Sequence, residues 1–300
     1  MRDAPQTRSE LLSPRPSLAG CVFAAIARDT RGAALSEAER FNHFPASPLV
    51  ALTAVIEGET RLARGESAPQ AAKDAPALPP VSAVGPHLTP MSSWNPGPIA
   101  AVSIGFYPEA WSLLTGAAPE AASGQLSLEI PPLIEAAAAA FFGAEDAARG
   151  WDGFQDRLEP LWRDARNEVM GGAEGGDQQD AAPFSAGARR IADWSRWMIA
   201  QAALSSAGRS ARAMERRLRR WTGQNRQALS FLAAIEDLHA RVAHDADPDL
   251  AQLALEAGYS DQSHMGRAVR RATGFSPARL NRLIATHEAF WCYRLMGERY

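Results

Sequence analysis

Lysine is almost absent from this chain of 300 residues: Lys73 stands alone, and arginine supplies every other basic side chain. Cysteine is also scarce, and Cys21 and Cys292 lie too far apart in sequence to indicate a disulfide framework or a metal site. No apolar run reaches the roughly 18 residues of a membrane span, because the stretch 136–142 ends at Gly143. The first residues are charged rather than apolar, so we expect no secretory signal, no membrane partner and a cytoplasmic location.

Signatures of common enzyme classes are missing as well. The sequence contains no nucleophile elbow, P-loop, dinucleotide fingerprint or paired-carboxylate pattern. His43 and His87 are the histidines that a metal-dependent N-terminal enzyme would need, but neither belongs to a clustered spacing such as His-x-His. We interpret both as ordinary core or surface histidines. The sequence therefore predicts no catalytic residue, no metal and no cofactor.

Charge is distributed unevenly along the chain, although the net charge is only −3. Residues 1–184 hold 13 basic and 23 acidic side chains, a net charge of −10. Residues 185–300 hold 18 basic and 11 acidic side chains, a net charge of +7, and all 18 are arginines. A basic segment of this kind is typical of a nucleic-acid-binding region.

One phrase of sequence occurs twice in this basic segment, at 207–223 and at 257–274. Each copy predicts a helix, a tight turn made by glycine, and a second helix capped by serine. The turn and cap residues are Gly208 with Ser210 in the first copy and Gly258 with Ser260 in the second. This order is typical of a helix-turn-helix unit, whose second helix lies in the major groove of DNA.

Apolar residues between the two copies recur at helical spacing, and they are Leu229, Leu232, Ile235, Leu238 and Val242. They predict a connecting helix of about four turns, or ~25 Å. A stiff connection of this length would let the two units read successive major-groove faces, which lie roughly 34 Å apart.

Residues from about 187 to 284 resemble the DNA-binding domain of the AraC/XylS family of bacterial transcription regulators. The resemblance is carried by the run from Asp249 to His264 and by the closing Thr273-Gly274-Phe275-Ser276-Pro277, with the degenerate first copy at the family's spacing. It covers about a third of the chain. It implies a sequence-specific regulator that binds double-stranded DNA through two helix-turn-helix motifs joined by a linker helix.

In the second unit, the recognition helix is expected from about 260 to 272, with Met265, Ala268 and Val269 facing inward. The DNA-binding candidates are Gln262, Ser263, His264, Arg267 and Arg271. A glutamine can pair with adenine, and an arginine can bind guanine O6 and N7. We expect His264 near a phosphate or in a structural contact, and Arg270 and Arg271 at phosphates or in solvent. Gly266 departs from the small polar residue that is usual at its position in the family.

In the first unit, Met214 and Leu218 should point inward. The DNA-binding candidates are Arg212, Glu215, Arg216 and Arg219. Arg212 and Arg216 are predicted to enter the groove. Glu215 either accepts from cytosine N4 or pairs with Arg212 or Arg219 along the helix, and we favour the intrahelical pair. Two further arginines, Arg217 and Arg220, are expected at phosphates or in solvent.

Unlike the C-terminal part, the N-terminal part is predicted to contain strands. Residues 49–60 and 100–107 predict strands, 65–80 a mobile loop, and 130–166 helices. This part resembles the small cupin-like β-barrel followed by helices that is found in the family, although chain order does not distinguish a barrel from a sandwich. The aromatic set Phe41, Phe44, Trp94, Phe106 and Trp111 lines a ligand pocket or fills a core, and we favour the core.

The expected fold class is α+β: an N-terminal small β-barrel or sandwich with helices, and a C-terminal all-α domain. We predict a sensor or dimerisation domain at 1–170, a glycine-rich linker at 171–184 and the DNA-binding domain at 185–300. RNA polymerase, a small-molecule effector and a second copy of the chain are candidate partners. The alternative is a metal-dependent cupin-like enzyme domain fused to a DNA-binding domain. The aromatic tail at 290–293 is expected to pack on the protein.

Overall fold

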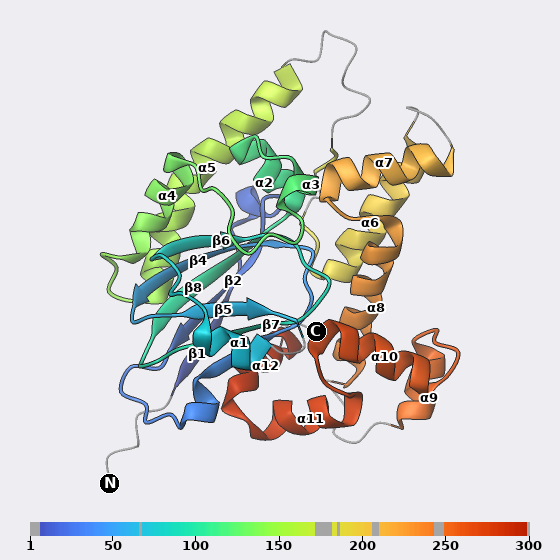
Figure 1. Ribbon diagram of the computed structural model, residues 1–300. Coiled ribbons are helices and arrows are strands. Elements are labelled where there is room, and N and C mark those ends of the chain that lie inside the picture. Colours follow the sequence, from blue (N-terminus) through green and yellow to red (C-terminus); the bar gives the residue numbers. More distant parts are fainter. Residues whose placement is uncertain are drawn as a thin grey trace.

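The described residues form two antiparallel sheets and a set of helices (Figure 1). The computed structural model describes residues 7–65, 68–171, 182–184, 187–205, 210–242 and 249–298. The five-stranded sheet has the order β1 (Arg8–Leu12), β2 (Val22–Asp29), β8 (Ala100–Phe106), β4 (Val50–Glu57) and β6 (Val81–Val84). The three-stranded sheet has the order β3 (Phe41–Phe44), β7 (Met91–Trp94) and β5 (Arg61–Arg64).

The two strands predicted from sequence are confirmed as β4 and β8, which pair with each other in the five-stranded sheet. The β-rich N-terminal part with helices and the helical C-terminal part are confirmed too. The sheets do not close into a barrel, because each keeps its own hydrogen-bonded strand order within the described residues. Of the two alternatives that the sequence left open, the N-terminal fold is the two-sheet one.

Alternation along β8 explains which face of the five-stranded sheet carries the core. Val102, Ile104 and Phe106 are fully buried on one face, whereas Ala101 and Ser103 point to the other face and are only partly buried. Side chains two residues apart share a face of a strand, so the bulky residues form one layer and the small residues another. The small-residue face looks toward the three-stranded sheet.

Helices pack against the bulky face of the five-stranded sheet and against the three-stranded sheet. In the N-terminal part these are α1 (Ala68–Asp74), α2 (Pro108–Thr115), α3 (Pro119–Ala122), α4 (Pro132–Ala138) and α5 (Ala147–Gly171), with 3-10 turns at Pro16–Leu18, Glu37–Arg40 and Ala139–Phe141. The helical pattern predicted for 130–166 is confirmed by α4 and α5. The loop predicted for 65–80 is wrong over α1, because Ala68 and Ala72 are buried against the three-stranded sheet and Trp94.

The C-terminal part is helical throughout its described length. It comprises α6 (Ile191–Leu204), α7 (Ala211–Thr222), α8 (Arg226–Val242), α9 (Leu250–Glu256), α10 (Gln262–Thr273), α11 (Pro277–Thr286), a 3-10 turn (Glu288–Phe290) and α12 (Trp291–Gly297). Ser276 precedes α11 and Pro277 is its first residue, and the serine hydroxyl makes no capping hydrogen bond. The aromatic tail packs inside the protein, with Phe290, Trp291 and Tyr293 buried.

The main core continues across the predicted domain boundary. Buried residues of the N-terminal part such as Tyr107 and Trp111 share one cluster with Trp194 of α6 and Leu218 of α7. The side chain of Trp194 donates its Nε1–H to Glu109 Oε1 at 2.8 Å. Residues 172–181 of the predicted linker and Gly208 of the first predicted turn lie outside the described residues. Within the described residues, no helix is long and apolar enough to cross a membrane.

Candidate nucleic-acid interface and cavity

The first candidate recognition helix is α7, and local sequence explains its limits. Ser210 caps its start, since the hydroxyl oxygen accepts from the Ala213 N–H at 3.1 Å, as predicted. Gly223 ends it with a left-handed conformation at φ +70°. Leu218 and Trp221 are buried in the main core. The opposite face is left to exposed arginines, namely Arg212, Arg216, Arg219 and Arg220.

Glu215 makes a different contact from the one that we favoured. Its carboxylate accepts from the backbone N–H of Arg226 at 3.3 Å, and its Oε1 lies 3.9 Å from Arg226 Nε. Arg226 is the first residue of α8, so Glu215 joins two helices instead of pairing with Arg212 or Arg219 along α7. A carboxylate near a helix N-terminus is favourable because free N–H groups face it.

Arg217 is also placed differently from the prediction. Its side chain is 3% exposed and donates from Nε and Nη2 to the Ala202 carbonyl at 3.2 and 2.7 Å. That carbonyl belongs to the last turn of α6, where backbone acceptors lack helical partners. Arg217 therefore caps α6, and the expectation of phosphate or solvent contact is wrong for this arginine.

The second candidate recognition helix is α10, and aspartate rather than the expected Ser260 caps it. Asp261 Oδ1 accepts from the His264 N–H at 2.7 Å, a hydrogen bond that lowers the pKa of Asp261 below its ordinary value. Ser260 instead donates to Asp261 Oδ2 at 3.1 Å. The His264 ring lies edge-on to Tyr259 with 5.2 Å between ring centroids, and its Nδ1 is 3.2 Å from Ser260 Oγ. His264 thus contacts its own turn.

The two faces of α10 separate as the sequence predicts. Met265 and Val269 are buried in the second core as predicted, Ala268 is partly buried against it, and Ala272 is buried as well. The exposed face carries Gln262, Ser263, His264, Arg267, Arg270 and Arg271. Arg271 lies with its guanidinium carbon 4.6 Å from the centre of the Phe231 ring on α8, a cation–π contact that holds it beside the connecting helix. A Cβ at Gly266 would meet no atom within 4 Å, so this glycine leaves an open patch between Gln262 and Arg267.

The connecting helix is confirmed as α8, whose 17 residues span about 25 Å. Of its predicted apolar residues, Leu229 belongs to the first core and Leu232, Ile235 and Leu238 to the second. Figure 1 shows α7 at one end of α8 and α10 at the other. One rigid element therefore holds both candidate recognition helices.

A cavity of about 240 Å³, which was not predicted from the sequence, lies between the two sheets of the N-terminal part. Small residues leave the space, because Ala51, Ala101, Ser103 and Gly105 alternate along β4 and β8 on the face opposite the core. Small residues at every second position of a strand were the feature of the sequence that could have predicted this cavity. The aromatic residues for which the sequence left pocket or core open have different places. Phe44 lines the cavity, whereas Phe106 and Trp111 are buried in the core.

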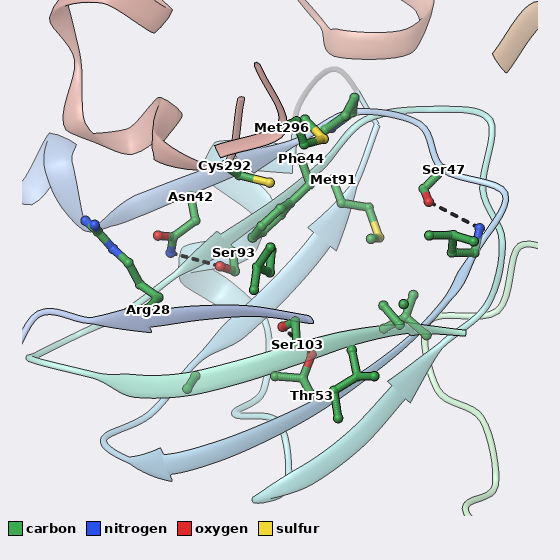
Figure 2. Close-up of a pocket in the computed structure, with 18 of the residues that line it drawn as sticks. Arg28, Asn42, Phe44, Ser47, Thr53, Met91, Ser93, Ser103, Cys292 and Met296 are labelled. Atoms are coloured by element: carbon green, nitrogen blue, oxygen red, sulfur yellow. Dashed lines mark hydrogen bonds between the residues drawn. The ribbon is translucent and has the colours of Figure 1, made fainter. Parts of the chain in front are cut away.

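The C-terminal segment forms one wall of this cavity. Figure 2 shows Cys292 and Met296 above the cavity, Asn42 and Ser93 beside it, and Thr53 and Ser103 below. Trp291 donates its Nε1–H to Asn42 Oδ1 at 2.7 Å, which joins α12 to strand β3. The α12 side chains that line the cavity therefore belong to the segment that directly follows α10 and α11 in the chain.

The two N-terminal histidines are engaged in ordinary contacts. His87 lies with Nδ1 3.2 Å from the Gly85 carbonyl and Nε2 3.3 Å from the Pro45 carbonyl, and burial lowers its pKa to about 4. His43 packs against Phe290 with 4.6 Å between ring centroids, and burial lowers its pKa to about 4 as well. Over the described ranges, no group of three His, Cys, Asp or Glu residues could hold a metal ion.

Residues 204–282, which contain α7 to α10 and most of α11, match the family model of a helix-turn-helix domain. The C-terminal region is an AraC-type helix-turn-helix domain. It binds DNA, and its α7 and α10 are the second helices of the two units.

Similarity beyond the AraC-type domain is weak. No curated protein matches the chain in sequence. A structure of ToxT from Vibrio cholerae is 9% identical, covers 93% of this chain and 98% of that chain, and has a TM-score of 0.38. A second structure, ToxT bound to an unsaturated fatty acid, is 9% identical, covers 94% of this chain and 97% of that chain, and has a TM-score of 0.36.

The AraC-type domain touches the N-terminal part at the ends of both recognition helices. A Cβ on Gly223, after α7, would lie 2.4 Å from the Pro119 carbonyl oxygen. The Ala272 carbonyl, at the end of α10, accepts from the Ala46 N–H at 2.8 Å. The glycine that ends α10, Gly274, has Pro90 as its neighbour across the same boundary. Corresponding turns of the two units are therefore both held by the N-terminal part.

Proposed function

We propose that this chain is a sequence-specific transcription regulator without enzymatic activity, in which α7 and α10 enter successive major grooves of one DNA duplex. The observation that carries the proposal is the exposed polar face of each recognition helix within the AraC-type domain, backed by an apolar face in the core. The connecting helix α8, about 25 Å long, holds the two helices apart, as binding in successive grooves roughly 34 Å apart on one side of DNA requires. Action in the cytoplasm, with RNA polymerase as a partner, follows from this role.

The side chains proposed to read bases are Gln262 and Arg267 of α10 and Arg212 and Arg216 of α7. All four are exposed, and each has the hydrogen-bonding pattern that fits adenine or guanine edges in the major groove. Ser263 and Arg219 are proposed as neighbouring contacts. Glu215, His264 and Arg271 have partners within the protein, and we assign them to positioning and to the DNA backbone.

Control by a small-molecule effector is the second part of the proposal. The cavity between the sheets has the apolar lining and the few polar groups that are typical of ligand sites. Its wall includes Trp291, Cys292 and Met296 of α12, so an occupant would press on the segment that follows α11. We propose that residues 1–170 act as the sensor or dimerisation part and 185–300 as the DNA-binding part. Occupancy would alter how α10 is held relative to α7.

The double substitution Arg216→Ala with Arg267→Ala tests base reading by both helices. Both side chains are exposed, so the fold should be unaffected. We expect binding to operator DNA to fall to the level of binding to random DNA, since each lost bidentate contact removes roughly 1–3 kcal/mol of discrimination. Competition titrations with labelled operator and unlabelled random duplex measure this ratio.

The matched control for this experiment is Arg163→Ala, which removes another exposed arginine, on helix α5 of the N-terminal part. It should keep the operator preference of the original protein. A double variant that still distinguishes operator from random DNA would contradict the assignment of Arg216 and Arg267.

A further inference from the structure

The cavity has two charged side chains in its wall, counting the described residues, and both are already engaged. Glu236 of α8 accepts from the backbone N–H groups of Ile191 and Ala192 at 3.0 and 2.6 Å, and so caps the start of α6. Arg28 of β2 is 5% exposed and forms an ion pair with Glu288, with 2.7 Å between Nη2 and Oε1. Both charges are thus balanced or hydrogen-bonded within the protein, although the buried Nε of Arg28 has no hydrogen-bond partner there.

Further contacts hold the Arg28 guanidinium where it is. Its Nη1 donates to Ser9 Oγ at 2.7 Å, and its guanidinium carbon lies 5.2 Å from the centre of the Trp291 ring. Glu288 in turn accepts from Thr7 Oγ1 at 2.6 Å and from Arg294 Nη2 at 2.9 Å. Drawing Arg28 toward a ligand carboxylate would leave Glu288 without its buried partner, which is costly.

Besides Arg28 and Glu236, the described wall residues that titrate are His87 and Cys292, and both are neutral near pH 7. Burial lowers the pKa of His87 to about 4 and raises the pKa of Cys292 to about 12. The His87 imidazole therefore carries no positive charge, and the Cys292 thiol carries no negative one.

Uncharged polar groups remain beside the apolar lining. Asn42 donates to Ser93 Oγ at 3.0 Å and to Asn95 Oδ1 at 2.6 Å, and it accepts from Trp291. On the facing sheet, the hydroxyl oxygens of Thr53 and Ser103 lie 2.8 Å apart. Hydroxyl groups can rotate to donate or accept, so they suit a ligand hydroxyl or carbonyl group.

We propose that the cavity binds a neutral, largely apolar molecule with one hydroxyl or carbonyl end. A cavity of ~150 Å³ holds benzene, so about 240 Å³ suits a ligand of roughly ten non-hydrogen atoms. A carboxylate would lose its hydration without gaining an unpaired cation, and burying a charge on those terms is strongly unfavourable. This inference rests on the effector site of the proposed function and specifies its ligand class.

Titration calorimetry of the full chain with 1-octanol and with octanoate at pH 7.5 tests the ligand class. The two probes share one alkyl chain and differ in charge. We expect saturable binding of one octanol per chain and at least tenfold weaker binding of octanoate. Octanoate binding as tight as octanol, or no binding of octanol, would overturn the inference.

Two substitutions locate the site. Ala51→Leu fills the cavity from β4 and should abolish octanol binding, whereas Ala136→Leu, on the exposed face of α4, should leave it unchanged. Glu288→Gln removes the anion that holds Arg28, so octanoate should bind this variant at least tenfold more tightly than the original protein. Octanol binding that survives Ala51→Leu, or octanoate affinity unchanged in Glu288→Gln, would count against the cavity and against charge exclusion respectively.

DNA is absent from these titrations, so their outcome is independent of operator binding. Adding octanol to the protein bound to labelled operator then tests control by an effector. If octanol binds in the cavity while operator affinity stays constant, the ligand class stands and the proposed control by this ligand fails.

Discussion

At the scale of single residues, position on a helix decides the role of chemically identical side chains. Arg216 and Arg217 are neighbours, yet Arg216 is exposed and Arg217 is buried. The sequence contained the signal, since 217 lies three residues after Met214 and four before Trp221, on the apolar stripe of α7. Arg217 was predicted to be exposed because arginine is usually a surface residue, although its position lies on the apolar face of α7. Of the two helix caps, Ser210 was predicted correctly and Ser260 was not. Ser260 and Asp261 are both good N-cap residues, and Asp261 is the one that caps α10.

Arg217→Met should lower the free energy of unfolding by roughly 1–3 kcal/mol, because the buried Ala202 carbonyl loses its charged donor. Arg219→Met is the matched control, since its side chain is exposed on the same helix. It should leave stability within about 0.5 kcal/mol. Urea unfolding of the three proteins measures the difference, and equal midpoints for the two variants would contradict the interior role of Arg217.

Glu109 gives the protein a pH-dependent stability. Burial raises its pKa from 4.5 to about 8, and Trp194 is its hydrogen-bond donor. Between these values the folded protein keeps a proton that the unfolded chain has lost, so stability falls as pH rises from about 4.5 to 8. Glu109→Gln keeps an acceptor for Trp194 and should remove this fall. Unfolding midpoints measured from pH 5 to 8 check it, and an unchanged slope in the variant would refute the assignment.

At the scale of elements, the sequence predicted those with strong periodicity or a repeated phrase. The helices α8 and α10 and the strands β4 and β8 are found within a few residues of the predicted bounds. The short helix α1 could not be predicted, because its seven residues are held by burial of Ala68 and Ala72 against another sheet rather than by local preference. The division of the strands into two sheets could not be predicted either. It depends on hydrogen bonds between strands that are distant in sequence, and the order of strands along the chain does not give their order in a sheet.

Gly223, which ends α7, and Gly258, in the turn between α9 and α10, allow a comparison of backbone strain and packing. Gly223 at φ +70° and Gly258 at φ +80° both have left-handed backbones, but only Gly223 faces another atom, the Pro119 carbonyl. Gly258→Ala should cost about 1 kcal/mol of stability through the backbone alone. Gly223→Ala should cost at least a further 1 kcal/mol, because α7 must move away from α3. Equal losses in urea unfolding would show that this contact is not tight.

At the scale of the whole molecule, the resemblance predicted a β-rich part followed by a DNA-binding part, and both are present. It did not predict how closely they are joined. Asn42 and Trp291 are 249 positions apart in sequence and hydrogen-bonded in the fold. A single sequence has no signal for such a pair, because neither periodicity nor charge connects them. The α12 wall of the cavity was missed for the same reason, whereas the small residues along β4 and β8 were a signal for the cavity itself.

Selection of bound sequences from random duplex DNA by the full chain tests the central claim most directly. If α7 and α10 read successive grooves, the selected DNA should carry a motif of two parts about 10–11 base pairs apart. Affinity for the selected DNA should fall steeply with salt, since the region that holds the AraC-type domain has a net charge of +7. Steep salt dependence without any enriched motif would mean that the arginines contact only phosphates, and it would contradict sequence-specific reading.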